Sequence, residues 1–268
     1  MFIENITTRK TIIIHIFGIN ISLKTHIKYY FWKLLGVFID FCFFLKRINL
    51  NKDYKIISLG LYCFSRVITT TNKLKPRRRK GEKSCPFDLV FSDFDKNVDL
   101  INNNFENFFE GLEKNSDGHW FNPKIKMLYF HDDNLSKNEF IKRYKTRIKN
   151  LYEYFSDKSK HKFILLTTDQ HINQEQITNL QNALEKYMNK NEFDIILINK
   201  SENICNYNDD NVHIINQHKN LKQWKYISEN DWVYSIKKRY FPEALKIYTE
   251  ITNSMINIIK EVMRNKNK

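Results

Sequence analysis

The chain has 268 residues, of which 42% are hydrophobic and 15% aromatic, so it can bury one large core or one core with an appendage. This composition excludes a disordered protein, and only 6 glycines and 4 prolines exclude repeats and low-complexity linkers. A net charge of +14 favours anionic partners, either acidic or phosphorylated substrates or an anionic membrane surface. No specific nucleic-acid partner is expected, because no aromatic residue interleaves with the dense basic run.

The four cysteines indicate a reducing compartment. Cys42, Cys63, Cys85 and Cys205 form no CxxC pair, which excludes a zinc ribbon and a thioredoxin motif. They are too sparse for a disulfide scaffold, so the cytoplasm is the expected location. A zinc site built from Cys63, Cys85, His119 and His131 would lack paired spacing, and no metal is predicted.

The first 52 residues are interpreted as an apolar and basic appendage to a domain over 53–268. Within the appendage, 29–45 is almost wholly apolar and aromatic, with lysines on both flanks. It is short for a membrane span, and Lys33 and Asp40 interrupt it. The alternatives are an apolar helix packed on the domain, an interfacial helix, which would place the protein at the periphery of an anionic membrane, and a true membrane span.

Strands and helices then alternate along the chain. A buried strand over 54–60 ends at Gly60, and a helix opens at 61–65. A turn at 84–90 precedes a helical stripe of Val98, Ile101, Phe105 and Phe108, for which Gly111 is a plausible stop. The further elements expected are strands at 127–130, 163–166, 193–198 and 212–215, and helices at 140–155, 177–187 and 244–262.

This alternation predicts an α/β fold. Continuous apolar strands between amphipathic helices are typical of a mainly parallel sheet with helices on both faces, in three layers. In such sheets ligands bind beyond the carboxyl ends of the strands. The residues expected at that edge are 60–63, 131–133, 167–169 and Asn199. His161 and His171, which flank the strand at 163–166, are expected to be solvated.

Cys63 is the leading candidate for a nucleophile. It lies in the first turn of the predicted helix, where the helix dipole would lower the pKa of its thiol. His131, after the strand at 127–130, is its candidate base, and Asp169 is the candidate group that orients the pair. Asp169 could equally cap the following helix. Cys63 could also be only a small buried hydrophobic residue.

The basic run at 73–80 offers a candidate binding element. It contains Arg77, Arg78 and Arg79 in a predicted loop after the first helix. A solvated loop and a site for a negatively charged ligand are both compatible with it. If the loop folds back over the helix, it could recruit an anionic substrate to the edge that holds Cys63.

Four motifs in order resemble a bacterial and viral family of unknown function described as papain-like cysteine peptidases. They are Ile57-Ser58-Leu59-Gly60-x-x-Cys63, Cys85-Pro86-Phe87-Asp88, Phe105-x-x-Phe108 and Tyr129-Phe130-His131-Asp132. The resemblance runs from about Tyr54 to the C-terminus. It implies that Cys63 is the nucleophile and His131 the base, and that Asp88 shapes the substrate site together with Gly60.

Two other functions stay open. The SLGxxC pattern is also similar to cysteine-dependent enzymes of capsular polysaccharide synthesis, which use a Cys–His pair and bind coenzyme A. That similarity implies an acyltransferase acting on a surface glycan, whereas the peptidase-like reading needs no cofactor. The third reading is a non-catalytic binding module, which predicts an unreactive Cys63 with no histidine near it.

Overall fold

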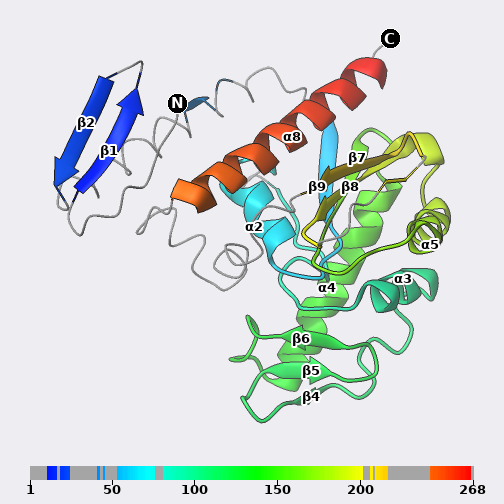
Figure 1. Cartoon of the computed structure of the whole chain (residues 1–268). Helices are drawn as coiled ribbons and strands as arrows, with labels where there is room; N and C mark the ends of the chain where they lie inside the picture. The colour runs from blue at the N-terminus through cyan, green and yellow to red at the C-terminus, as the bar shows by residue number, and fades with distance from the viewer. Residues whose placement is uncertain are drawn as a thin grey trace. The chain divides into compact units, whose positions relative to one another are not determined.

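Four parallel strands form the central sheet of the protein, in the order β3-β7-β8-β9 (Figure 1). They are β3 (Tyr54–Ser58), β7 (His161–Thr168), β8 (Phe193–Asn199) and β9 (Val212–Asn216). β7 and β8 are buried along their whole length, as their continuous apolar sequences predict. The computed structural model describes residues 11–16, 19–24, 41–42, 45, 53–75, 81–201, 206–207, 209–216 and 242–266.

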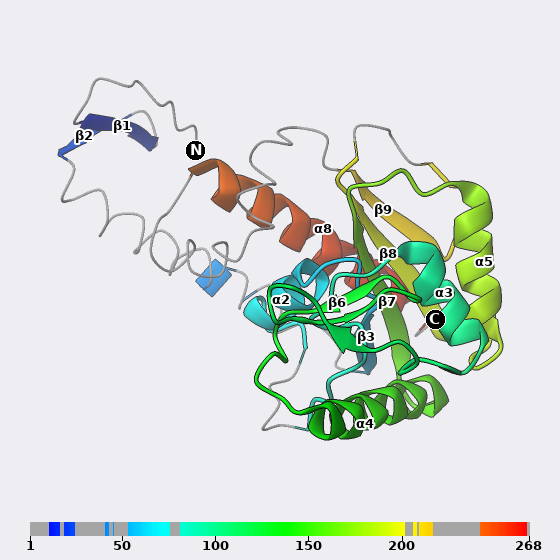
Figure 2. The same ribbon diagram turned by 90° about the horizontal axis from the view of Figure 1, so that it is seen from below.

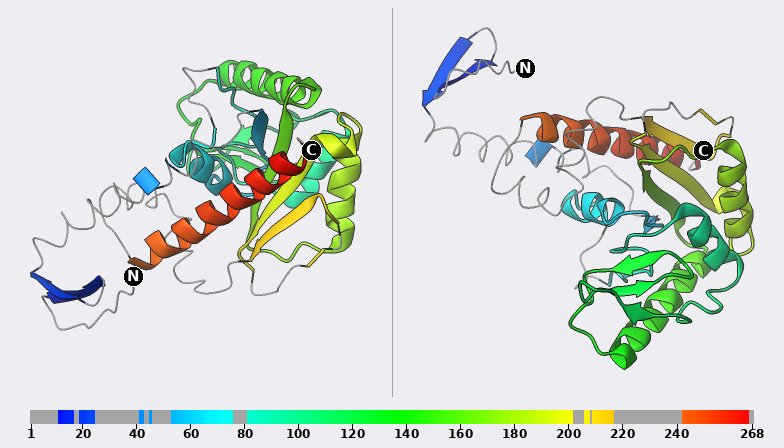
Figure 3. Two further views of the ribbon diagram at one scale, coloured as in Figure 1. Left: turned by 90° about the horizontal axis from the view of Figure 1, so that it is seen from above. Right: turned by 60° about the horizontal axis from the view of Figure 1, so that its bottom comes forward.

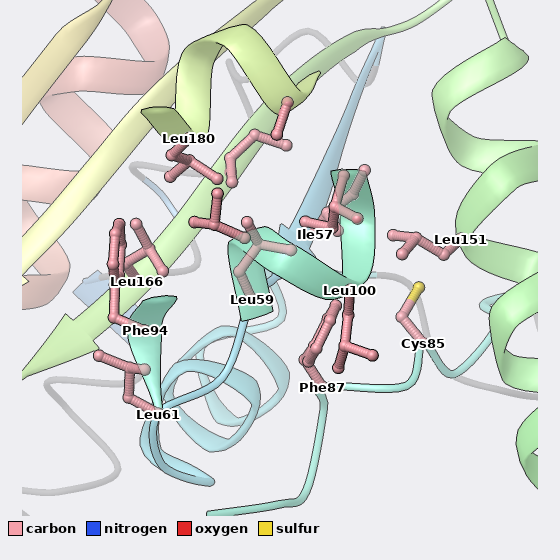
Figure 4. Packing of buried hydrophobic residues seen from close by; sticks show 14 of the residues in the cluster. Ile57, Leu59, Leu61, Cys85, Phe87, Phe94, Leu100, Leu151, Leu166 and Leu180 are labelled. Carbon is pink, nitrogen blue, oxygen red and sulfur yellow. The ribbon is translucent and has the colours of Figure 1, made fainter. Parts of the chain in front are cut away.

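Helices cover both faces of this sheet, which confirms the predicted α/β class. On one face lie α3 (Phe94–Asn102), α4 (Lys137–Ser156) and α5 (Gln174–Glu185), as Figure 2 shows. Side chains from alternate strand positions, such as Ile57 and Leu166, pack there against Phe94, Leu151 and Leu180 (Figure 4). On the opposite face lie α2 (Phe64–Thr71) and residues 254–266 of α8 (Pro242–Lys266), as Figure 3 shows.

Local signals in the sequence set where the long helices begin. Ser136 caps α4, and the carboxylate of Glu139 accepts a hydrogen bond from the backbone N–H of Ser136 in return. Asn173 and Gln176 form the same reciprocal arrangement at α5. Each capping box satisfies backbone N–H groups that have no partner within the helix.

Two predicted elements differ in the structure. The helix expected over Val98–Phe108 ends at Asn102, because Asn104, Phe105 and Asn107 adopt positive φ angles that no α-helix accommodates. Phe105 and Phe108 are buried as expected, but from turns.

The strand expected at 127–130 does not belong to the parallel sheet. β6 (Met127–Tyr129) pairs antiparallel with β5 (Trp120–Asn122), which pairs with β4 (Glu113–Lys114) in a separate small sheet. The prediction that His131 follows a strand of the parallel sheet was therefore wrong. A three-residue strand is too short for its pattern to show which sheet it joins.

The chain divides into two compact units, 51–221 with 254–268 and 1–50 with 222–253. The first contains both sheets described above. In the second, β1 (Thr11–Ile16) and β2 (Ile19–Lys24) form an antiparallel pair. The apolar helix predicted at 29–45 lies outside the described residues except for Phe41, Cys42 and Leu45, which are helical. No helix among the described residues is long and apolar enough to cross a membrane.

Candidate functional site

Cys63 follows a tight strand-to-helix turn. β3 ends at Ser58, and the backbone then passes through Gly60 and Leu61 with φ angles of +81° and +64° before it reaches Cys63, the N-cap residue of α2. A Cβ atom at Gly60 would lie 2.9 Å from the Oγ of Ser92 and 3.3 Å from Phe87. Only glycine fits here, so the structure gives Gly60 a role in shaping the turn.

Side chains from the following segment hold this turn in place. The amide of Asn97 donates to the carbonyl of Leu59 at 2.7 Å and to the Oγ of Ser92 at 2.9 Å. The same Oγ accepts from the backbone N–H of Leu61 at 3.2 Å. Because Asn97 is buried, these bonds are shielded from competition with water.

The structure brings Cys63 and His131 together. The Sγ of Cys63 lies 3.5 Å from the Nε2 of His131, within the range of a hydrogen bond to sulfur. The two residues are 68 positions apart, and each reaches the site from the end of a different sheet. Cys63 is half-buried and its side chain makes no helix-capping bond.

The protonation of this pair differs from the sequence-based prediction. Burial raises the pKa of the Cys63 thiol to about 12, against the opposing effect of its own backbone N–H, so the predicted low-pKa thiol is wrong. Loss of solvent around the imidazole lowers the pKa of His131, although Asp132 and Asp133 act in the other direction. At neutral pH the resting pair is therefore a thiol beside a neutral imidazole that can accept its proton.

The two carboxylates that follow His131 are used by other partners. Asp132 is buried and binds Arg143, the hydroxyl of Tyr144 at 2.9 Å and Arg147 at 3.3 Å. Asp133 binds the Nδ1 of His119 at 2.7 Å. Among the described residues, no carboxylate is hydrogen-bonded to His131, so within this part of the chain the site consists of the Cys63–His131 pair.

Asp169, the predicted orienting group, lies at the end of β7 and contacts a different residue. Its Oδ1 accepts a hydrogen bond from the hydroxyl of Tyr62 at 2.6 Å. Burial of Tyr62 together with this bond raises the pKa of the phenol well above its usual value. Asp169 is thus connected to the site through the residue that precedes Cys63.

Asp88 lies inside the protein, in a cluster of charges beneath α2. Its carboxylate is 2% exposed, accepts the backbone N–H of Cys85 at 2.8 Å and lies 3.5 Å from Lys75 and 3.7 Å from Arg66. Arg66 also binds Glu82, with one of its two hydrogen bonds at 2.7 Å. Arg66 lies one turn after Cys63, so this cluster holds the start of α2 in place. Asp88 therefore supports the site from a buried position beneath it.

The remaining predicted residues, Arg77, Arg78 and Arg79, lie outside the described residues. Within the described ranges, no group of three or more potential ligands could hold a metal ion.

Sequence reasoning placed Tyr62 at the carboxyl edge of the sheet without giving it a role, and it did not name Lys200. The Nζ of Lys200 lies 4.9 Å from the centre of the Tyr62 ring. The rule that ligands bind beyond the carboxyl ends of parallel strands could have found Lys200, because it directly follows β8. Fold and site together define an α/β protein with a Cys–His pair next to its parallel sheet. No family model matches the chain, and neither does any curated protein or solved structure.

Proposed function

We propose that the protein is a cysteine-nucleophile enzyme that cleaves an acyl or amide bond, with Cys63 as nucleophile and His131 as general base. The observation that carries this proposal is the distance of 3.5 Å between Sγ and Nε2. A non-catalytic module with a merely buried cysteine gives no reason for a histidine at that position. The resemblance to papain-like cysteine peptidases has the same two residues in the same order.

The chemistry follows from the protonation of the pair. His131 takes the thiol proton on Nε2 as the sulfur attacks the carbonyl carbon, and the positive end of α2 stabilises the negative charge that develops on sulfur and oxygen. The carbon–leaving group bond then breaks, and the leaving group takes the proton from His131. Water, activated by the same imidazole, hydrolyses the thioester and restores the thiol.

Transfer of the acyl group to a hydroxyl acceptor is the second candidate function for the same pair. Half-buried aromatic rings near the pair favour this second function. The ring centroids of Tyr62 and Phe91 lie 5.2 Å apart, and those of Phe91 and Phe130 lie 5.0 Å apart. The Phe130 ring in turn lies beside the ring of His131. Such rings can stack against a sugar acceptor. In this case coenzyme A would be the acyl donor, and its binding remains a prediction from the sequence.

Trapping of the thioester tests the proposal. The full chain is mixed with p-nitrophenyl acetate, quenched in acid and mapped by peptide mass spectrometry. We expect acetyl groups on Cys63, none at that position in Cys63→Ser, and slower acylation in His131→Asn, with His119→Asn as the matched control. Acetylation that is equal in all four proteins would refute the proposal. Addition of a sugar alcohol separates the two functions, since only an acyltransferase would form the acetylated sugar faster than the acid.

A further inference from the structure

The residue that follows His131 is buried and anchored to α4. Asp132 is 1% exposed, and its carboxylate binds three side chains of that helix, which are Arg143, the hydroxyl of Tyr144 at 2.9 Å and Arg147 at 3.3 Å. Hydrogen bonds to a charged group that is shielded from water are stronger than exposed ones. A single carboxylate therefore ties the turn after β6 to positions spread over one turn of α4.

The backbone of Asp132 fixes the turn that carries His131. The N–H of Asp132 donates to the carbonyl of Tyr129 at 3.3 Å, and its carbonyl accepts from the N–H of Leu135 at 3.1 Å. On the other side of His131, the ring of Phe130 lies 4.4 Å from the imidazole, centroid to centroid. The chain is thus held in place both before and after the imidazole.

Helix α4 connects this turn to the sheet that leads to Cys63. It contacts β3, and Leu151 of α4 lies in the same buried core as Ile57 of β3 (Figure 4). Both side chains are fully buried, so the helix is held against the strand by close packing. From Cys63 through β3, α4 and Asp132 to His131, each step is therefore a packed or hydrogen-bonded contact.

We propose that Asp132 is a positioning residue, which through its bonds to α4 holds the Nε2 of His131 within reach of the Cys63 thiol. The proposal rests on the proposed function, because it assumes that His131 is the base for Cys63. Asp132 acts through His131, so its removal should matter only while His131 is present.

A double-mutant cycle tests this dependence. Second-order rate constants for the alkylation of Cys63 by iodoacetamide are measured at pH 7, with the labelled peptide identified by mass spectrometry. We expect Asp132→Asn to lower the rate constant of the wild type about tenfold, since a small displacement of His131 takes it out of reach of the thiol proton. In the His131→Asn protein, the same change should alter the rate constant less than about twofold.

A second variant separates position from charge, because the negative charge of Asp132 also opposes the lowering of the His131 pKa by burial. Tyr144→Phe removes one bond to Asp132 and keeps both its charge and the packed ring. We expect a loss of about threefold in the wild type and none in His131→Asn. This smaller change also decides the question if Asp132→Asn does not fold.

Asp194→Asn is the matched control. Asp194 is a buried carboxylate that also binds several side chains, but it lies at the start of β8, whereas Cys63 follows the carboxyl end of β3. Its loss should lower the free energy of unfolding and leave the rate constant at Cys63 unchanged. The control therefore shows what a general loss of stability does to alkylation.

Three outcomes overturn the positioning role of Asp132 and leave the proposed function standing. They are an unchanged rate constant in Asp132→Asn, equal losses with and without His131, and a loss in Asp132→Asn with none in Tyr144→Phe, which would assign the effect to charge. A His131→Asn protein that is alkylated as fast as the wild type overturns both proposals.

Discussion

Phe91 and Leu128 exchange two backbone hydrogen bonds, at 3.0 and 2.9 Å, and so join the segment after the Pro86–Phe87–Asp88 turn to β6. The next residue, Ser92, donates its backbone N–H to the carbonyl of Leu61 at 3.3 Å. One short segment is therefore bonded both to the turn before Cys63 and to the strand before His131. It sets the distance between two residues that come from different sheets.

Replacement of Ser92 by alanine tests this connection. The change removes the acceptor of the Leu61 N–H and one acceptor of Asn97, which leaves polar groups unpaired in a partly buried place. We expect the free energy of unfolding to fall by about 1–3 kcal/mol. Alkylation of Cys63 should slow as well, since the turn that holds it loosens. Denaturant unfolding and labelling kinetics measure the two effects, with Ser116→Ala at an exposed loop position as control. Identical behaviour of the two variants would show that Ser92 holds nothing in place.

Asp88→Asn tests the buried charge cluster. Asparagine can still accept from the Cys85 N–H, but Arg66 and Lys75 are left with Glu82 as their only carboxylate in the cluster. Removing one partner from a buried ion network leaves uncompensated charge, so we expect a loss of about 3 kcal/mol in unfolding free energy. Glu153→Gln breaks an exposed pair with Lys83, which solvent screens, and should cost much less. A loss in Asp88→Asn no greater than in this control would contradict the structural role of the cluster.

The lowered pKa of His161 predicts how the free energy of unfolding depends on pH. Its Nε2 lies 2.7 Å from Asp194, which also binds His213 at 2.6 Å. Burial lowers the pKa of His161 despite the bond to Asp194, and Lys162 and Lys266 act in the same direction as burial. In the unfolded chain its pKa is about 6.5, so below that pH the unfolded state binds a proton first. The contribution of neutral His161 to the free energy of unfolding is therefore complete above about pH 6.5. It is lost as the pH falls toward the pKa that His161 has in the folded protein.

The matching variant is His161→Gln, which keeps a donor for Asp194 and cannot titrate. We expect its unfolding free energy to vary less steeply than that of the wild type between about pH 6.5 and 5. His131, whose pKa is also lowered, contributes equally to both proteins. The exposed His171, replaced by glutamine, is the control. Parallel profiles for wild type and His161→Gln over this range would show that His161 gains no proton on unfolding.

The sequence predicted the central sheet well because its strands are uninterrupted apolar runs, such as 163–166 within β7. It predicted the setting of Cys63 because a glycine between strand and helix requires a turn. It did not predict the route to His131, since antiparallel pairing of β6 depends on distant residues such as Phe91. It also missed the burial of His161, because Lys160 and Lys162 beside it suggest an exposed strand end, while Asp194, which binds it, is 33 residues away.

The pH dependence of Cys63 alkylation in wild type and His131→Asn tests the central claim most directly. Neutral His131 accepts the thiol proton, so the wild-type rate should fall as the pH drops through the lowered pKa of His131, below about 6.5. In His131→Asn we expect a rate at pH 7 that is about 100-fold lower and rises only in alkali, where the Cys63 thiol, with its pKa raised to about 12, begins to ionise. His119→Asn should keep the wild-type profile. Identical profiles for wild type and His131→Asn would contradict the account.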